Sequence, residues 1–501
     1  MKENPIAHSE MTTYTEVLAP PTIRLGPLRW LRENLFSTWF NTLLTIGALF
    51  CLGWLSSGLY QWMIASATWS GGAEACQQAR TAALKQDLPR GACWNVVPEN
   101  LRTLLVGTYP GPELWRVWAC VYFAATLLGL SGGLWGRLVR EAAIALGSAA
   151  ILLLLLPFNG EERLWIGGIA LGTFVGLGLG WWRSAQRLWR WNVLILWALS
   201  PVIVTLLLGG FIFHQPSLTQ SFTVWSLFLL FGLFAAILLY RRSNLPIPKA
   251  FVAFAGFAAC AIVGWLVLPE SPMAGLPESV LLALPPVTTT QWGGLLLTFM
   301  LAIVGIVTSF PFGVMLALGR QSSLPIVRWV SVSYIEVIRG VPFISVIFMV
   351  SLMLPLALPS HMRVDQAVRV MVAFMLFSAA YIAENVRGGL QAIPRGQYEA
   401  ARALGLSGLL TTFFIVLPQA LRMVIPANVG TFIGLFKDTS LVFMAALLDF
   451  FNVGRGVLAN PVWIGKDTEM LLFIAFVYWV FTYFMSHMSR RLEKVLGVGE
   501  R

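Results

Sequence analysis

The stretch GGLLLTFMLAIVGIVTSFPFGVMLALG, residues 293–319, contains no Asp, Glu, Lys or Arg. The hydrocarbon core of a bilayer is about 30 Å thick, and an α-helix needs about 20 mainly apolar residues to cross it. Residues 293–319 therefore predict a transmembrane helix. Charge is also absent from three other long segments, 34–73, 117–136 and 191–240. We expect an all-α polytopic membrane protein.

The composition agrees with this class. Of the 501 residues, 57% are hydrophobic and 11% are charged, whereas soluble domains carry roughly a quarter charged residues. The net charge of +11 comes largely from groups of Lys and Arg between the apolar segments, which is typical of cytoplasmic loops. We therefore expect a lipid bilayer around the chain and no nucleic-acid partner. The groups are Arg137 and Arg140; Arg183, Arg187 and Arg190; Arg241, Arg242 and Lys249; and Arg490, Arg491 and Lys494.

About twelve spans are predicted, with both termini in the cytoplasm. The expected domains are a cytoplasmic tail (1–35), an N-terminal extension of about seven spans (36–268), a periplasmic linker (269–290), a five-span core (291–490) and a cytoplasmic tail (491–501). The segment near 65–112 is expected in the periplasm. The predicted spans are 36–64, 113–134, 141–158, 163–182, 191–213, 222–240, 250–268, 292–318, 334–358, 368–390, 411–448 and 470–489. The window 411–448 is too long for one straight helix, so irregular backbone is expected around Pro418 and Pro426.

The cysteines and histidines indicate no catalytic or metal site. Cys76 and Cys93 lie in the expected periplasmic segment, where an oxidising environment favours a disulfide; two unpaired thiols are the alternative. The chain has four His and no H-E-x-x-H pattern. Gly465-Lys466 lacks the upstream Gly and the following Ser or Thr of a phosphate-binding loop. We expect no cofactor bound by this chain. Cys51, Cys120 and Cys260 are expected to be small hydrophobes inside spans.

The most specific motif is EAARALG, residues 399–405, followed nine residues after Gly405 by IVLP, residues 415–418. Tyr398 to Leu404 consists of good helix formers, and Gly405 can end that helix in a left-handed conformation. The pattern resembles the EAA loop of importer permeases of the ATP-binding-cassette superfamily. The resemblance implies a short cytoplasmic helix that docks on an ATPase subunit. The implied docking residues are Glu399, Ala400, Ala401, Arg402, Leu404 and Gly405, with the small alanines permitting close approach.

Three more strings narrow the resemblance. YIEVIRGVP (334–342), AYIAENVRG (380–388) and KDTSL (437–441) resemble the polar amino-acid permeases of the histidine/glutamine/arginine/opine group, which have Thr at the place of Val341 and usually an aliphatic residue at that of Asn385. This resemblance covers residues 290 to 495. More loosely, the N-terminal 290 residues resemble the enlarged permease subunits of general L-amino-acid importers, through strings such as GACW (91–94).

These resemblances imply a non-catalytic permease subunit of an ATP-driven amino-acid importer in the bacterial inner membrane, forming half of the translocation pathway. The implied partners are a sister permease subunit in a heterodimer, two ATP-binding-cassette ATPase subunits that hold ATP and Mg, and a periplasmic amino-acid-binding protein. The alternative is a self-sufficient, ion-coupled secondary amino-acid transporter. Such a transporter usually has inverted repeats with broken helices, and no convincing internal repeat is found in the sequence.

Charged residues inside predicted spans are functional candidates because they are costly in hydrocarbon. Glu384 lies one turn before Arg387 and can pair with it, so a structural role and a role in the substrate pathway both stay open. Asn428, Thr431, Leu435 and Asp438 recur along one face of a helix, and this stripe is expected to face the pathway or another helix. Asp438 could bind the ammonium group of the substrate, or it could pair with a cation on a neighbouring helix.

Overall fold

The computed structural model describes residues 27–86, 90–155, 160–184, 187–209, 287–357 and 364–497. These residues are mainly helical and include only isolated bridges between extended residues, which confirms the predicted all-α class. In the first half of the chain the elements are α1 (Pro27–Asn34), α2 (Trp39–Tyr60), η1 (Gln61–Ala65), α3 (Gly72–Lys85), α4 (Val96–Glu99), α5 (Leu101–Val106), η2 (Gly111–Glu113), α6 (Leu114–Leu134), α7 (Arg137–Leu153), α8 (Gly160–Trp182) and α9 (Arg187–Gly209).

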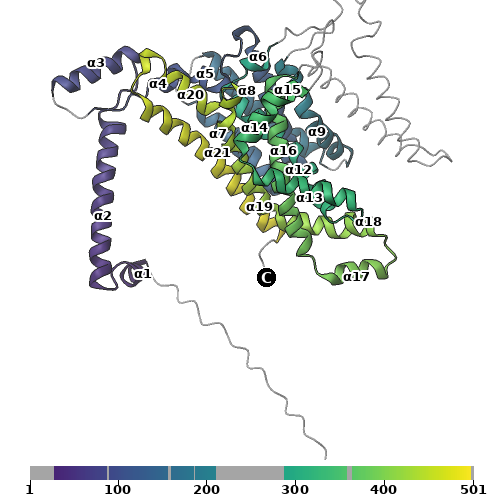
Figure 1. The fold of residues 1–501 in the computed structure, drawn as a ribbon. Coiled ribbons are helices and arrows are strands. Elements are labelled where there is room, and N and C mark those ends of the chain that lie inside the picture. Colours follow the sequence, from purple (N-terminus) through teal and green to yellow (C-terminus); the bar gives the residue numbers. More distant parts are fainter. Residues whose placement is uncertain are drawn as a thin grey trace, which may run out of the picture. The chain divides into compact units, whose positions relative to one another are not determined.

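In the second half, the elements of the predicted core follow one another along the chain (Figure 1). They are η5 (Thr289–Gln291), α12 (Gly294–Arg320), α13 (Pro325–Gly340), α14 (Phe343–Phe348), η6 (Met349–Met353), α15 (Leu354–Ala357), α16 (Gln366–Gln391), α17 (Arg395–Ala403), α18 (Gly408–Leu410), η7 (Thr411–Val416), α19 (Leu417–Asp438), η8 (Thr439–Ala445), α20 (Phe450–Leu458), η9 (Pro461–Trp463) and α21 (Asp467–Leu496).

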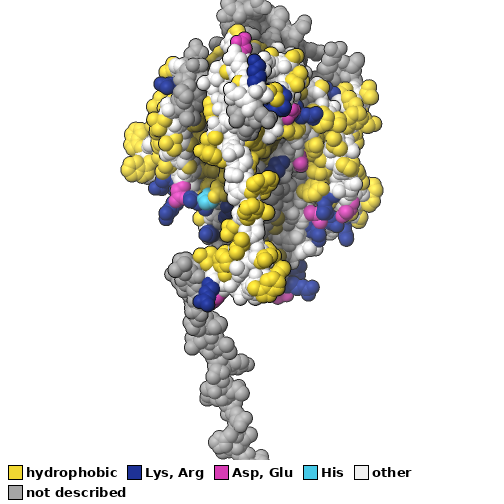
Figure 2. All heavy atoms as spheres, turned by 90° about the vertical axis from the view of Figure 1, so that its left-hand side faces the viewer, with side chains coloured by type: hydrophobic (Ala, Val, Ile, Leu, Met, Phe, Trp, Pro, Cys, Tyr) yellow, Lys and Arg dark blue, Asp and Glu magenta, His cyan; other side chains and the backbone are white. Residues whose placement is uncertain are grey.

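Six single helices are long and apolar enough to cross a membrane, and two bent helix pairs raise the number to eight if each pair is one span. The six include α2, α6, α8, α12, α16 and α21, and all coincide with predicted spans. Hydrophobic side chains cover much of the described surface in Figure 2, as a lipid environment requires. Helices α7 and α9 overlap the predictions 141–158 and 191–213 but are not among the six. The predictions 222–240 and 250–268 lie outside the described residues, and the count of twelve is not confirmed.

The predicted span at 334–358 is not one straight helix. Residues 325–340 and 343–357 form two helices that meet at an angle of 110°. The break falls at Val341, whose extended backbone (φ −111°, ψ 138°) follows from the ring of Pro342, because proline disfavours a helical conformation in the residue before it. Irregular backbone is present in the window 411–448, as expected: η7 is a π-helix, and a bend of 59° separates residues 408–423 from 425–445.

The described chain forms two compact units, residues 1–93 and 94–501. In the first, α2 begins after Thr38, whose hydroxyl accepts a hydrogen bond from the Asn41 backbone N–H (3.2 Å). None of the α2 side chains is buried, so this apolar helix relies on its surroundings to cover it. A disulfide joins Cys76 of α3 to Cys93, with the two Cα atoms 5.8 Å apart.

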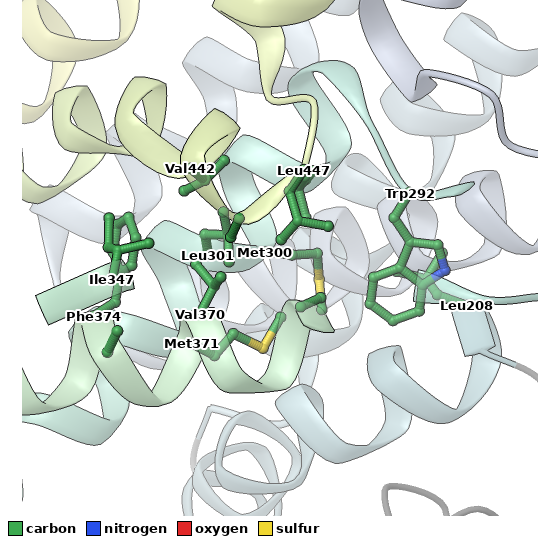
Figure 3. Packing of buried hydrophobic residues seen from close by; sticks show 14 of the residues in the cluster. Leu208, Trp292, Met300, Leu301, Ile347, Val370, Met371, Phe374, Val442 and Leu447 are labelled. Atoms are coloured by element: carbon green, nitrogen blue, oxygen red, sulfur yellow. The ribbon is translucent and has the colours of Figure 1, made fainter. Parts of the chain in front are cut away.

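The second unit does not separate the N-terminal extension from the predicted core. One cluster of buried side chains includes Val117 and Cys120 of α6 and Leu208 of α9, together with residues of α12, α14, α16 and η8. Figure 3 shows Leu208 beside Trp292, close to Met300 of α12. The Tyr109 hydroxyl also donates a hydrogen bond to the Leu208 carbonyl oxygen (2.9 Å). In the described residues between 94 and 209, the extension therefore shares its buried surface with the core, and the boundary between the compact units, after Cys93, differs from the predicted domain boundaries.

Glycines let α6 and α8 approach until their backbones touch. A Cβ added at Gly176 would lie 3.0 Å from the backbone nitrogen of Leu130 and would overlap the Thr126 carbonyl group. Gly180 of α8 and Gly129 and Gly133 of α6 face the opposite backbone in the same way. Close packing of small residues stabilises helix pairs in lipid, where no hydrophobic driving force acts between helices. Four glycines thus hold α6 and α8 together.

We predict that Gly176→Val lowers the stability of the protein by about 1–3 kcal/mol, because the added side chain forces the two helices apart. Gly178→Val is the matched control, since Gly178 is exposed on the same helix and has open space around it. Thermal unfolding of the purified proteins in detergent measures both variants. Equal loss from the two substitutions would show that valine in α8, and not the contact with α6, causes the effect.

Candidate docking helix and translocation pathway

The predicted docking motif forms α17 and its C-terminal turn. The helix ends because Gly405 adopts a positive φ of 73°. The Leu406 N–H donates to the Ala401 carbonyl oxygen (3.1 Å), and the Gly405 N–H donates to that of Arg402 (2.9 Å). This is the bonding pattern of a Schellman cap, which favours glycine at the left-handed position. A Cβ at Gly405 would meet no atom within 4 Å, so backbone conformation alone makes glycine the favoured residue.

The side chains of α17 are divided between an exposed face and the rest of the chain. Glu399, Ala400, Arg402 and Leu404 are exposed, and Leu404 keeps 80% of its surface. Among the described residues, the side chains of Glu399 and Arg402 form no hydrogen bond or ion pair, so both charges are available to a partner. Ala401 is 3% exposed. The expectation that both alanines permit close approach therefore needs a correction: Ala401 faces the protein's own chain, and Ala400 faces outward.

Helix α17 is held between two predicted spans. It follows α16 after three residues and packs against η7, which leads into α19. The Gln419 side chain of α19 donates to the Gln397 side chain of α17 (3.2 Å) and to the Ile415 carbonyl oxygen of η7 (2.7 Å). Figure 1 shows α17 beyond the ends of α13 and α19. A displacement of α17 would therefore act on α16 and α19 together.

Glu384 of α16 lies at the centre of a group of arginines from three helices. Its carboxylate accepts hydrogen bonds from Arg387 of the same helix and from Arg320 at the end of α12 (3.2 Å), and it forms an ion pair with Arg339 at the end of α13 (3.3 Å). Arg320 also pairs with Glu336 of α13 (3.0 Å). The pairing with Arg387 confirms the spacing argument. Arg320 and Arg339 were not anticipated, because they are distant in sequence. The geometry favours the structural alternative for Glu384, since its carboxylate is already neutralised by cations.

Asn385 connects α16 to the predicted polar stripe on α19. Its side-chain amide donates to the Asn428 oxygen (3.0 Å) and to the Thr431 hydroxyl (3.1 Å). Asn428 is 3% exposed, and Leu435, the next member of the stripe, is 2% exposed within the main core cluster. The sequence left open whether the stripe faces the pathway or another helix. In the structure, Asn428 and Thr431 lie against α16.

Asp438 is separate from the asparagine group. It is the last residue of α19, where the helix gives way to η8. Gln366, the first residue of α16, donates to the carbonyl oxygen of Ala445 at the end of η8. This places Asp438 toward the end of the bundle where α16 begins. In the described part of the chain, its carboxylate takes part in no hydrogen bond or ion pair, so the structure shows no cation from a neighbouring helix bound to it.

One buried carboxylate was not singled out from the sequence. Asp449 is fully buried and caps α20, accepting from the Phe451 and Asn452 backbone N–H groups (3.2 and 3.1 Å) and from the Tyr478 hydroxyl of α21 (3.1 Å). Burial raises the pKa of Asp449, and these hydrogen bonds partly oppose the shift. An Asp directly before an apolar run is a recognised start signal for a helix, and this signal was available in the sequence.

The long apolar helices and the EAA-like motif on α17 are typical of one class of protein, the membrane-embedded subunits of transport systems. The chain belongs to the amino-acid permeases of ATP-binding-cassette transporters, and the family described as binding-protein-dependent transport system inner membrane component matches residues 309–497. It is a transport subunit of the inner membrane without catalytic activity of its own.

Two relatives match almost from end to end. The inner membrane amino-acid ABC transporter permease protein YhdY of Escherichia coli is 33% identical over 94% of this chain and 93% of its own length. The glutamate/glutamine/aspartate/asparagine transport system permease protein BztC of Rhodobacter capsulatus is 35% identical over 96% and 97%. The shorter glutamate/aspartate import permease protein GltK of Escherichia coli is 35% identical over 40% of this chain and 91% of its own.

We predict that Glu384→Gln destabilises the protein by on the order of 2 kcal/mol, because the substitution leaves the arginines without their shared anion. Glu336→Gln is the control. The Glu336 side chain is 57% exposed and that of Glu384 is 15% exposed, and exposed ion pairs contribute about 0–1 kcal/mol. Thermal unfolding of the purified proteins compares them. A loss of stability from Glu336→Gln as large as that from Glu384→Gln would contradict a central role for Glu384.

Proposed function

We propose that the chain forms half of the translocation pathway of an ATP-driven amino-acid importer and that α17 couples it to an ATPase subunit. The exposed face of α17 carries this proposal. A short helix with a fixed C-terminal turn presents Glu399, Ala400, Arg402 and Leu404, and two of these are charges without a partner in the described chain. A groove of opposite charge pattern on another protein is the environment in which these charges would be paired.

The importer in this proposal has four further protein subunits and lies in a lipid bilayer. Two ATP-binding-cassette ATPase subunits hold ATP and Mg and perform the hydrolysis. A sister permease, different from this chain, supplies the other half of the pathway, and a periplasmic amino-acid-binding protein delivers the substrate. Both termini of the chain lie on the cytoplasmic side of the bilayer. The substrates are polar amino acids, a proposal that the names of the relatives BztC and GltK support.

Asp438 is the proposed contact for the substrate's ammonium group. A cation that leaves water needs an anionic partner, and the Asp438 carboxylate forms no ion pair with any cation of the described residues. Glu384 is less suitable, because three arginines already surround it. Asn428 and Thr431 remain in the proposed pathway as hydrogen-bonding groups, although Asn385 occupies them in this conformation. Movement of α16 against α19 would release them.

We predict that Gly405→Val abolishes most uptake, because a β-branched residue at positive φ is a steric outlier and would distort the end of α17. Gly408→Val is the control, since Gly408 lies in the same loop with open space around it and without a positive φ. The measurements are amino-acid uptake into proteoliposomes and recovery of the ATPase subunit with the purified permease. Arg402→Glu should weaken this recovery without disturbing the cap. Normal uptake and recovery in both Gly405→Val and Arg402→Glu would refute the docking role.

Asp438→Asn preserves size and removes the charge. If Asp438 binds the ammonium group, substrate-dependent uptake should fall by about tenfold or more, since a hydrogen bond to a charged group contributes roughly 1.5–3 kcal/mol. Assembly with the ATPase and basal ATP hydrolysis should persist. Lys437→Gln, which alters the neighbouring exposed charge, should have a smaller effect. Unchanged uptake in Asp438→Asn, or failure of the complex to assemble, would decide against this role.

A further inference from the structure

A cavity of about 470 Å³ lies between α12, α19 and α21. Eight of its ten lining residues are apolar, and the other two are Arg422 and Asn428. The Asn428 oxygen already accepts a hydrogen bond from Asn385, which leaves Arg422 as the one charged group on the wall. The volume is within the range of about 300–1,000 Å³ that small-molecule pockets occupy. The cavity therefore combines an apolar interior with a single cation.

Arg422 lies at the end of the cavity beside the last turn of α21. A Cβ at Gly497 would be 3.5 Å from an Arg422 terminal nitrogen, and Leu492 and Leu496 of α21 line the cavity. Arg422 is exposed, and its guanidinium group forms no hydrogen bond or ion pair with the described residues. The positive charge at this end of the cavity therefore comes from Arg422.

This end of the bundle is the end that carries α17, because Arg422 is in the second turn of α19, soon after η7. If α17 lies in the cytoplasm, as the proposed function requires, the mouth of the cavity faces the cytoplasmic leaflet. The cytoplasmic leaflet contains anionic lipids, and basic pockets between membrane helices on the cytoplasmic side bind the headgroups of these lipids. An apolar wall offers a polar amino acid few hydrogen bonds to replace those it makes with water. An acyl chain makes no hydrogen bonds with water and therefore loses none in such a cavity.

We propose that this cavity binds one anionic phospholipid of the cytoplasmic leaflet, with an acyl chain between α12, α19 and α21 and the phosphate at Arg422. The acyl chain lies against Phe310, Leu421, Ile425 and Phe432. The lipid fills space that would otherwise separate α21 from α19, the span that continues from the docking segment. Bound lipid thus becomes part of the packing between these two spans.

Photolabelling of the complete importer tests this assignment. The complex is reconstituted into nanodiscs of phosphatidylcholine and phosphatidylglycerol, with a diazirine on an acyl chain of one lipid or the other. After irradiation, mass spectrometry of peptides locates the label. We expect phosphatidylglycerol to label the peptides that contain Leu421, Ile425 or Leu492, and phosphatidylcholine to label them much less. Equal labelling by both lipids, or no label on these peptides, would overturn the proposal.

Two arginine variants separate a specific site from general attraction. Arg422→Gln should lower labelling by phosphatidylglycerol about fivefold, which corresponds to the loss of about 1 kcal/mol for one cation near an anionic surface. Arg328→Gln should not change it, because Arg328 is an exposed arginine on α13 and does not line the cavity. An equal decrease in the two variants would contradict the site.

A third variant tests the competing occupant, a helix of the sister permease. Ile425→Cys allows disulfide cross-linking to cysteines placed on the sister subunit. An efficient cross-link at this position would show that protein fills the cavity and would overturn the proposal, whereas absence of a cross-link together with the lipid label supports it. These experiments measure lipid contact and not transport. Their failure would leave the coupling role of α17 untouched, and failure of docking would leave the lipid result intact.

Discussion

Polar side chains on α16 must find partners inside the protein, because hydrocarbon offers them none. The helix meets this constraint near both of its ends. Gln366 and Arg369 donate to the carbonyl oxygens of Ala445 and Ser351 near its start. Toward its end, Asn385 donates to α19, and Glu384 gathers arginines from α12 and α13. These four residues therefore link α16 to neighbouring elements, and α16 becomes the element around which the core is arranged.

This arrangement has a mechanical consequence for the proposed coupling. Helix α17 follows directly from α16 and is bonded to α19 through Gln397 and Gln419. The arginine group around Glu384 joins the same end of α16 to the ends of α12 and α13, and α13 meets the following helix at 110°. A force on α17 would reach four helices through hydrogen bonds and ion pairs that are short and directional. The hydrogen bonds from Asn385 to α19 are neutral and are the easier ones to exchange during movement.

The N-terminal extension uses a different kind of interaction. Helices α6 and α8 meet through glycines, and buried apolar side chains of α6 and α9 join the core cluster. Arg491, near the end of α21, pairs with Glu141 of α7, so one ion pair also ties the extension to the last span. The described residues of the extension between 94 and 209 are thus packed into the same body as the core. A bound anionic lipid near Arg422 would add a further component to the packing around α21.

Properties that depend on neighbours along the chain were readable from the sequence alone. Uncharged apolar stretches predicted α2, α6, α8, α12, α16 and α21 because hydrophobicity and length decide whether a helix can cross a bilayer. The break around Pro418 and Pro426, the helix 398–404 ended by Gly405, and the pair Glu384–Arg387 also follow from local spacing. The bend at Val341 was not predicted, although the following Pro342 is a local signal that disfavours helix at this position.

Properties that depend on which helices meet were decided only by the tertiary structure. Arg320 and Arg339 reach Glu384 from other helices, Gly129 and Gly176 matter because α6 and α8 lie against each other, and Ala401 turns inward because α17 packs on η7. The sequence shows that a residue is polar, small or charged. It does not show its partner, because the packing of one helix on another brings together residues that no periodicity along a single helix relates.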